Sequence, residues 1–181
     1  MISYGSLSVR SKQTGHIVYV DLFRNFAFVA RREYEIEQCR SFDLLLDRFL
    51  PKVFWDIGAN IGLYSLFFLS RRPNGSVLAF EPDLRNLYLF NRTVRRNALS
   101  AVKIVPKAVD RQAGETTFFL DNITGFLDNI TGATGTIVPN NFFISDQYGA
   151  IPMQMRIKTT TLDEQLRENE GPMSKSGIIC S

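Results

Sequence analysis

The chain reads Phe54-Trp55-Asp56-Ile57-Gly58-Ala59-Asn60-Ile61-Gly62-Leu63-Tyr64-Ser65 about a third of the way along its length. An apolar segment ends on a carboxylate, and a short glycine-containing turn then opens a helix. In a parallel α/β sheet, this order builds a site for a nucleotide-type ligand above the carboxyl ends of the strands. Gly58 and Gly62 fit such a site, because a residue without a Cβ lets the backbone approach a ligand closely.

A second acidic residue follows the next apolar segment. Glu81 comes directly after Val77-Leu78-Ala79-Phe80, which has the composition of a buried strand. Because neighbouring parallel strands end at the same edge of a sheet, we expect Asp56 and Glu81 to lie side by side. One carboxylate can then face an amine or water, and the other a ribose diol.

Strand and helix patterns alternate between residues 34 and 105. Helices are expected at 34–49, at 63–70 and from Pro82-Asp83 onward, and strands at 53–56, 76–81 and 102–105. The alternation predicts an α/β fold with a doubly wound, mostly parallel, Rossmann-like sheet. The expected buried stripes are Phe42, Leu45, Leu46 and Phe49 in the first helix and Leu84, Leu87, Phe90 and Val94 in the third.

The two ends of the chain differ from this pattern. We divide the sequence into residues 1–50, with N-terminal strands or a flap and a helix, and residues 51–181, with the sheet. Residues 16–30 read as extended, because Val18 and Val20 alternate with polar residues and Phe26 and Phe28 follow. This segment is expected to form a hairpin or a lid-like flap.

An antiparallel insertion is predicted around residues 115–160. Its strands are expected at 116–120, 135–138 and 153–160, followed by a helix at 162–168 and a further strand from 178. Thr161 should cap that helix, with Glu164 at the reciprocal position. The segment FLDNITG at 119–125 is repeated without change at 126–132, and we interpret it as a loop duplication without a function.

Composition narrows the function classes. The net charge of +3 is small, and no basic stripe is interleaved with aromatic residues, so no nucleic-acid partner is expected. Cys39, Cys180 and His16 are far apart and have no metal or redox spacing, so no metal is expected. The N-terminus has no signal pattern and no apolar run reaches membrane-spanning length. A cytoplasmic protein that does not enter a membrane is the expectation.

The quoted motifs resemble those of the FkbM-type methyltransferases, which depend on S-adenosylmethionine. The resemblance rests on residues 54–65, on Ala79-Phe80-Glu81-Pro82 with Asn86, and on the segment 159–164, TTTLDE. It implies S-adenosyl-L-methionine as the cofactor and methyl transfer to a hydroxyl of a sugar or secondary metabolite. The partner implied is thus a small-molecule or glycan acceptor, and the oligomeric state stays open.

The resemblance also implies roles for single residues. It assigns Asp56, Gly58, Asn60 and Gly62 to the methionine part of the cofactor, and Glu81 to the ribose hydroxyls. Two further residues match family positions in the cofactor site, namely Asn86 at the following helix start and Ala108, within Lys107-Ala108-Val109, on the adenine side. Family members continue into an Ile-Asp-Val-Glu-Gly-like segment after the position of Cys180. We therefore expect a sheet that is incomplete at the C-terminus, in a fragment or a truncated product, and assign no catalytic base.

Other interpretations of these residues stay open. A nicotinamide-dependent oxidoreductase would need glycines at Asn60 and Leu63 to complete its Gly-x-Gly-x-x-Gly pattern, which disfavours it. A remnant that binds cofactor without catalysis is a third possibility. Gly58 and Gly62 could serve tight packing only, and Asp56 could cap the next helix. Asn60 could be a left-handed turn residue only, and Glu81 a solvated acid at a strand end.

Overall fold

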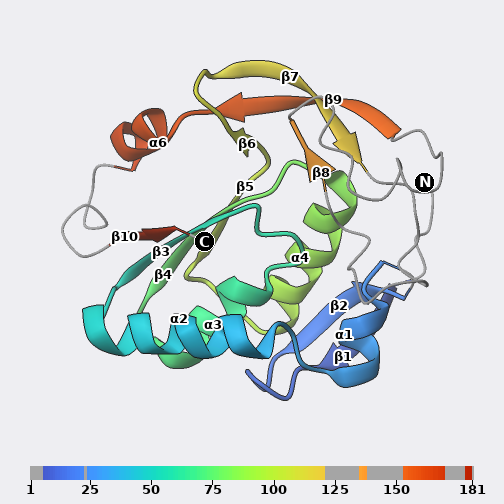
Figure 1. Ribbon diagram of the computed structural model, residues 1–181, viewed down its shortest axis with the longest axis vertical. Coiled ribbons are helices and arrows are strands. Elements are labelled where there is room, and N and C mark those ends of the chain that lie inside the picture. The colour runs from blue at the N-terminus through green and yellow to red at the C-terminus, as the bar shows by residue number, and fades with distance from the viewer. Residues whose placement is uncertain (1–5, 23, 121–134, 138–152, 170–177, 181) are drawn as a thin grey trace.

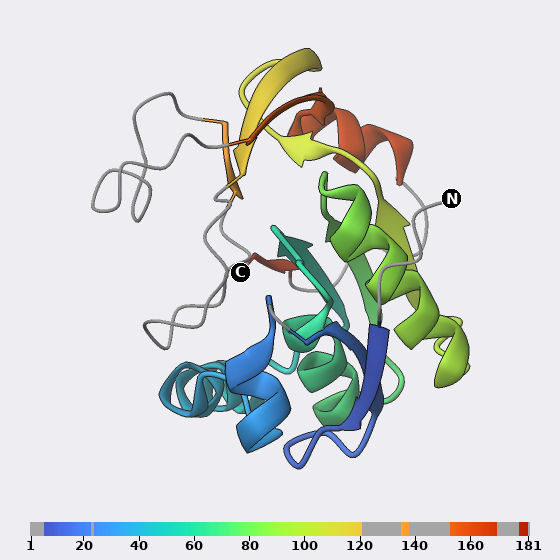
Figure 2. The ribbon, with the colours of Figure 1, turned by 90° about the vertical axis from the view of Figure 1, so that its right-hand side faces the viewer.

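The computed structural model describes residues 6–22, 24–120, 135–137, 153–169 and 178–180 (Figure 1). Within these residues the chain forms an N-terminal hairpin, a four-stranded parallel sheet and a four-stranded mixed sheet. Figure 2 shows the hairpin beside one of the helices that pack on the parallel sheet. The first strand of the mixed sheet, Ala108–Val109, follows shortly after Val102–Val105, a strand of the parallel sheet. The mixed sheet therefore starts beside the turns that follow the parallel strands.

The parallel sheet has the strand order β10-β3-β4-β5. Its strands are β10 (Ile178–Cys180), β3 (Val53–Ile57), β4 (Ser76–Phe80) and β5 (Val102–Val105). Helix α3 (Leu63–Arg71) links β3 to β4, helix α4 (Leu84–Arg96) links β4 to β5, and α2 (Ile36–Phe49) precedes β3. Ile57 pairs with Phe80, so β3 and β4 end level with each other. The predicted α/β fold with a parallel sheet is confirmed.

One face of this sheet carries all three of these helices. Its core joins Leu46 of α2, Phe68 of α3 and Phe90 of α4 to Phe54 of β3. The cluster on the other face consists of strand residues, with Trp55 and Phe80 at its centre, and contains no residue of a described helix. Within the described part of the chain the helices therefore cover one face only, and the doubly wound arrangement, with helices on both faces, is not confirmed there.

The N-terminal hairpin is anchored on α4. Strands β1 (Ser6–Arg10) and β2 (Ile17–Asp21) pair antiparallel, so a hairpin forms, but its other strand precedes the segment 16–30 in which the hairpin was predicted. The backbone N–H of Tyr19 donates to Thr93 Oγ1 at 2.9 Å, and that of Ile17 donates to Asn97 Oδ1 at 2.9 Å. These bonds satisfy edge-strand donors that would otherwise be open to other chains.

The prediction that residues 16–30 are extended is wrong for the last part of this segment. Residues Phe26–Arg31 form the short helix α1, which ends at Arg32 in a left-handed conformation. Phe28 is buried while Phe26 is 44% exposed. Two aromatic residues two positions apart fit opposite sides of a helical turn as well as one side of a strand, so their spacing alone was ambiguous.

Two predicted stripes are partly wrong. In α2 the buried residues are Cys39, Phe42 and Leu46, whereas Leu45 and Phe49 are exposed. In α4, Leu84 is exposed and the polar residue Thr93 is buried, because α4 packs against the hairpin as well as the sheet. None of the described helices combines the length and the apolar character that a membrane span requires.

The mixed sheet confirms the predicted antiparallel insertion. It consists of β6 (Ala108–Val109), β7 (Gly114–Leu120), β8 (Gly135–Thr136) and β9 (Met153–Thr160), in the order β6-β9-β7-β8. β7 is antiparallel to both of its neighbours, and only β6 and β9 are parallel. The duplicated segment lies outside the described residues except for its first two, at the end of β7.

Helix α6 (Leu162–Glu168) follows β9 and has the predicted cap. Thr161 Oγ1 accepts from the backbone N–H of Glu164 at 3.0 Å. The Thr160 hydroxyl donates to Glu164 Oε2 at 2.6 Å, and the backbone N–H of Thr161 also bonds this carboxylate. These hydrogen bonds lower the pKa of Glu164 and confirm the reciprocal capping arrangement.

The packing at Gly62 generates a prediction. A Cβ at this position would lie 2.1 Å from the ring of Phe90, and the backbone φ is +84°. Gly15 has a φ of +73° but nothing within 4 Å of an added Cβ, so it is a matched control for backbone strain alone. We expect Gly15→Ala to cost about 1–2 kcal/mol of unfolding free energy, and Gly62→Ala about 1–3 kcal/mol more. Urea unfolding of both variants measures the difference, and equal losses would contradict the packing role of Gly62.

Candidate functional site

The turn between β3 and α3 crosses the carboxyl end of β4. The backbone N–H groups of Gly58 and Ala59 both donate to the carbonyl oxygen of Phe80, at 2.9 Å each. Gly58, Asn60 and Gly62 all have positive φ, at +79°, +53° and +84°. The turn is therefore a series of left-handed residues that is fixed to the neighbouring strand, and two glycines adopt this conformation without the steric cost of a Cβ.

The two glycines have different surroundings. A Cβ on Gly58 would meet nothing within 4 Å, and Gly58 lines both of the pockets described below. Gly62 lines neither pocket, because its Cα lies against the ring of Phe90. Tight packing, one of the two interpretations of Gly62, thus has a structural basis, while its predicted contact with a ligand stays untested.

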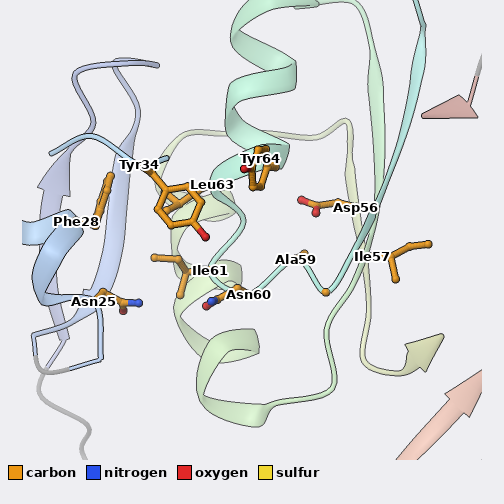
Figure 3. Close-up of a pocket in the computed structure, with 11 residues that line it drawn as sticks. Asn25, Phe28, Tyr34, Asp56, Ile57, Ala59, Asn60, Ile61, Leu63 and Tyr64 are labelled. Atoms are coloured by element: carbon orange, nitrogen blue, oxygen red, sulfur yellow. The ribbon is translucent and has the colours of Figure 1, made fainter. Parts of the chain in front are cut away.

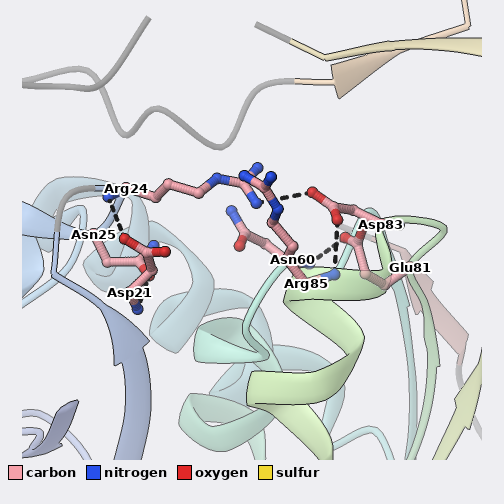
Figure 4. Close-up of polar contacts among 7 residues, drawn as sticks. All are labelled: Asp21, Arg24, Asn25, Asn60, Glu81, Asp83 and Arg85. Carbon is pink, nitrogen blue, oxygen red and sulfur yellow. Dashed lines mark hydrogen bonds and ion pairs between the residues drawn. The ribbon is translucent and has the colours of Figure 1, made fainter. Parts of the chain in front are cut away.

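Glu81 is buried at the end of β4 and holds two turns together. Its carboxylate accepts from the backbone N–H of Asn60 at 2.7 Å and from that of Asp83 at 2.8 Å (Figure 4). The side chain of Asn86 also bonds this carboxylate. Burial raises the pKa of Glu81 to about 7, although these hydrogen bonds act in the opposite direction. With 4% of its surface exposed, Glu81 is not a solvated strand-end acid.

Asp83 carries an ion pair that the sequence did not reveal. Its Oδ1 caps α4 by accepting from the backbone N–H of Arg85 at 2.8 Å, and its Oδ2 lies 2.9 Å from Arg24 Nη1 (Figure 4). Arg24 stands in the turn after β2, where its N–H donates to Asp21 Oδ1. The two partners are 59 positions apart, and no local pattern relates them. The pair links the hairpin to the start of α4.

Asp56 takes part in a different contact. It belongs to β3 and is almost fully buried, and its Oδ2 accepts from the hydroxyl of Ser65 in α3. The N-cap of α3 is Gly62, without a side-chain hydrogen bond, so Asp56 does not cap this helix. Both acids lie at the carboxyl ends of paired strands, as predicted, but each has its own partners.

Two adjoining pockets open at these turns. The first, called the tyrosine pocket, has a volume of about 200 Å³ and is lined by Asp56 and by Asn25, Phe28, Tyr34 and Tyr64 (Figure 3). The second, called the Glu81 pocket, has a volume of about 290 Å³ and is lined by Glu81, Asp83, Asn86, Ala108, Phe118 and Ile137. Both share the turn residues Ile57, Gly58 and Asn60.

The side chain of Asn60 lies at the junction of the pockets. Its backbone N–H is used by Glu81, whereas its Oδ1 is buried without a hydrogen-bond partner. A buried acceptor without a donor costs free energy that a ligand N–H or O–H would recover. Asn60 is a left-handed turn residue, and its orphan oxygen is an acceptor that a bound molecule could use.

The charged residues that line the two pockets are acidic, and one of them, Asp83, is paired with Arg24. Asp56 is the charged residue of the tyrosine pocket, and Glu81 and Asp83 are those of the other pocket. Among the described lining residues of both pockets there is no Lys, Arg or His. The described residues also contain no group of three or more His, Cys, Asp or Glu that could hold a metal ion. An electropositive or neutral ligand is favoured over an anionic one.

Tertiary contacts add residues that the sequence analysis missed. Asn25, Phe28 and Tyr34 come from the N-terminal segment, and Phe118 and Ile137 from the mixed sheet or its flank. The sequence predicts a hairpin or lid-like flap at residues 16–30, but assigns none of these five residues to the site. A Cβ on Gly135 would lie 2.0 Å from the ring of Phe118, so a glycine allows this close packing beside the Glu81 pocket.

Comparison with solved structures finds partial similarity to methyltransferases. A proposed caffeoyl-CoA O-methyltransferase from Staphylococcus aureus is 20% identical, with 46% of this chain and 41% of that chain covered and a TM-score of 0.40. TYW2 of M. jannaschii in complex with AdoMet is 16% identical, with 58% and 44% covered and a TM-score of 0.41. TYW2 of P. horikoshii in complex with MeSAdo is 15% identical, with 64% and 40% covered and a TM-score of 0.44.

This chain spans less than half the length of each of these three structures. No protein-family model matches its sequence, and a comparison with curated proteins gives no match. The motifs and the geometry of the two pockets are thus the features of this chain that bear on its function.

The buried carboxylate predicts a pH dependence of stability. The folded-state pKa of Glu81, about 7, lies above its ordinary value of 4.5, so the folded chain binds this proton more tightly than the unfolded chain. The stabilisation is complete below about pH 4.5 and is lost as pH rises through 7, by about 3 kcal/mol in total. Chemical unfolding of wild type and Glu81→Gln between pH 4.5 and 8 isolates this effect, because other titrations cancel in the difference. A difference that does not change with pH would contradict it.

Proposed function

We propose that this chain binds S-adenosylmethionine across the two pockets and is a methyltransferase of the FkbM type. The observation that carries the proposal is the buried carboxylate of Glu81. It accepts a hydrogen bond from the left-handed turn after β3 and lines one of the two pockets. The acceptor that we propose is a hydroxyl of a sugar or a secondary metabolite. This part rests on the motif resemblance alone.

The Glu81 pocket suits the nucleoside end of the cofactor. A carboxylate is a strong acceptor for the two vicinal hydroxyls of a ribose. Phe118, Ile137 and Ala108 line the same pocket and offer apolar surface to a flat base. The shared residues Ile57, Gly58 and Asn60 would then lie along the part of the ligand that continues into the tyrosine pocket, where Asp56 favours a positive charge.

The charge pattern disfavours a nicotinamide cofactor. Its pyrophosphate would bring two negative charges to a site whose described lining contains the acids Asp56 and Glu81 and no basic residue, and Arg24 is already paired with Asp83. Asn60 and Leu63 would also present side chains where that cofactor's motif has glycines. S-adenosylmethionine carries no phosphate and has a positive sulfonium, so its charges fit the site better.

The residues of the site act by binding and positioning. The cofactor supplies a methyl group on a sulfonium, which reacts when an acceptor oxygen is held in line with it. Burial of Asp56 and Glu81 excludes water from their side of the ligand, and the bonds from Asn60 and Asp83 hold Glu81 in place. We assign no catalytic base to the described residues, and a chain that binds cofactor without catalysis is the second candidate.

Calorimetric titration tests the choice of cofactor. We expect S-adenosylhomocysteine to bind with a dissociation constant of about 1–100 µM, and NAD to give no heat at the same concentrations. Binding of NAD without binding of S-adenosylhomocysteine would overturn the proposal. Binding of neither would exclude both cofactor classes for this chain.

The role of Glu81 is tested by substitution. Glu81→Ala should weaken S-adenosylhomocysteine binding by about 1–3 kcal/mol, because the ribose hydroxyls lose their charged acceptor. Glu37→Ala is a matched control, since Glu37 lies on the exposed side of α2 and pairs with Arg40. Thermal melts check that both variants are folded. An unchanged dissociation constant in Glu81→Ala would remove Glu81 from the ligand site.

A further inference from the structure

Two tyrosines form an aromatic wall of the tyrosine pocket. Tyr34 and Tyr64 both line it, and their rings meet edge to face, with centroids 5.7 Å apart and an interplanar angle of 78°. Figure 3 shows both rings and Asp56 around the same space, with Phe28 on the side of α1. The rings come from segments 30 positions apart, so this wall exists only in the folded chain.

A single carboxylate braces the wall. The hydroxyl of Tyr64 donates to Glu35 Oε2 at 2.5 Å, and the hydroxyl of Tyr34 also bonds Glu35. Glu35 has a φ of +37°, a left-handed conformation that costs energy in a residue with a Cβ. Gln13 fixes the backbone of Tyr34 through two hydrogen bonds of 2.8 Å, one to its carbonyl oxygen and one from its N–H. The rings are thereby held in place before any ligand arrives.

Both tyrosines remain neutral phenols near pH 7. Burial raises the pKa of Tyr34 and of Tyr64, and the hydrogen bonds to Glu35 raise it further. The charge of Asp56 also contributes to the raised pKa of Tyr34, which agrees with the two residues facing the same pocket. Neutral tyrosine rings have an electron-rich face that attracts cations.

The polar groups of the pocket favour a cation as well. Asp56 is the one charged residue among its described lining residues, and the orphan Oδ1 of Asn60 is an acceptor. No described lining residue carries a positive charge that would oppose a cation. Aromatic rings, a buried carboxylate and a free acceptor in one small pocket form a site for an organic cation.

We infer that Tyr34 and Tyr64, with Asp56, recognise the positive charge of the cofactor's sulfonium, so that this site binds the charged cofactor more tightly than its neutral product. Glu35 acts as a positioning residue that orients both rings. This inference rests on the proposed function. It goes further, because it assigns discrimination between the two forms of the cofactor to a wall that includes the N-terminal segment.

Three probes with the same nucleoside separate charge from shape. S-adenosylmethionine carries a sulfonium, sinefungin carries an amine at the corresponding place, and S-adenosylhomocysteine carries a neutral thioether. Calorimetry of wild type at pH 7.5 should give dissociation constants for the two charged probes about 3- to 30-fold lower than that for the neutral probe. Equal constants for all three would overturn the inference while leaving the proposed function intact. No binding of any probe would overturn both.

Substitutions then test which residues distinguish the charged probes from the neutral one. We compare the dissociation constant of the neutral probe with those of the charged probes. Tyr34→Leu and Tyr64→Leu should each reduce this ratio of neutral to charged, and the double variant should bring it close to one. Tyr64→Phe keeps the ring but loses the bond to Glu35, and Glu35→Gln keeps an acceptor without the charge, so both should reduce the ratio less than Tyr64→Leu. Tyr88→Leu is the matched control, because Tyr88 is half exposed on α4 and lines neither pocket.

The constant for S-adenosylhomocysteine serves as the internal reference in every variant. It should change less than the constants for the two charged probes, because its sulfur has no charge for the rings to attract, while its nucleoside and amino-acid group are the same in all three probes. Retention of the full wild-type ratio by the folded double variant would overturn the assignment to Tyr34 and Tyr64. Circular dichroism melts establish that each variant is folded, and the phenylalanine and glutamine variants provide the same test with smaller packing changes.

Discussion

The site depends on one constraint, which is that the carboxylate of Glu81 must find hydrogen-bond donors away from water. It finds them in the backbone N–H groups of Asn60 and Asp83, which belong to the turns after two neighbouring strands. Each bond fixes one turn relative to the other, so the loop after β3 and the start of α4 form one rigid edge. The raised pKa of Glu81 shows that the donors offset only part of the cost of burial.

Segments outside the parallel sheet supply the remaining walls of the two pockets at this edge. The turn after β2 brings Arg24 to Asp83, and this cation compensates a second buried carboxylate at the start of α4. The same N-terminal segment contributes Phe28 and Tyr34 to the tyrosine pocket, while the mixed sheet contributes Phe118 to the Glu81 pocket. The hairpin is held on α4 by bonds from its own backbone to Thr93 and Asn97. The two pockets therefore require three separate parts of the chain.

The sign of the charges, more than the shape of the turn, decides between ligand classes. A strand, a glycine-containing turn and a helix occur in proteins that bind phosphates and in proteins that bind other nucleosides. In this chain the turn lies beside Asp56 and Glu81, while Asp83 is paired with Arg24, and two tyrosine rings line the pocket that contains Asp56. Such surroundings oppose a pyrophosphate and attract a cation, and this physical difference supports the proposed cofactor where fold similarity is too distant to do so.

The sequence by itself determined the strands, the helices and the two acids of the site. Apolar runs of four or five residues between turn signals located β3, β4 and β5, because local periodicity and glycine placement depend only on neighbours in the chain. The same reasoning found Gly58 and Glu81, which lie at strand ends, whereas Asn60 was assigned to the site by the motif resemblance. Reasoning from local patterns failed at Phe26 and Phe28, because their spacing fits both a strand and a helix. It also failed for α4, because this helix packs against both the sheet and the hairpin.

Only the tertiary structure decided which residues share a pocket. The ion pair of Arg24 with Asp83, the contact of Gly62 with Phe90 and the brace of Glu35 on two tyrosines join residues far apart in the chain. No local pattern encodes such contacts, because they depend on how separate elements pack against one another. The sequence could place the acids at one edge of a sheet. The packing of the hairpin and the second sheet around that edge decided what else surrounds a ligand there.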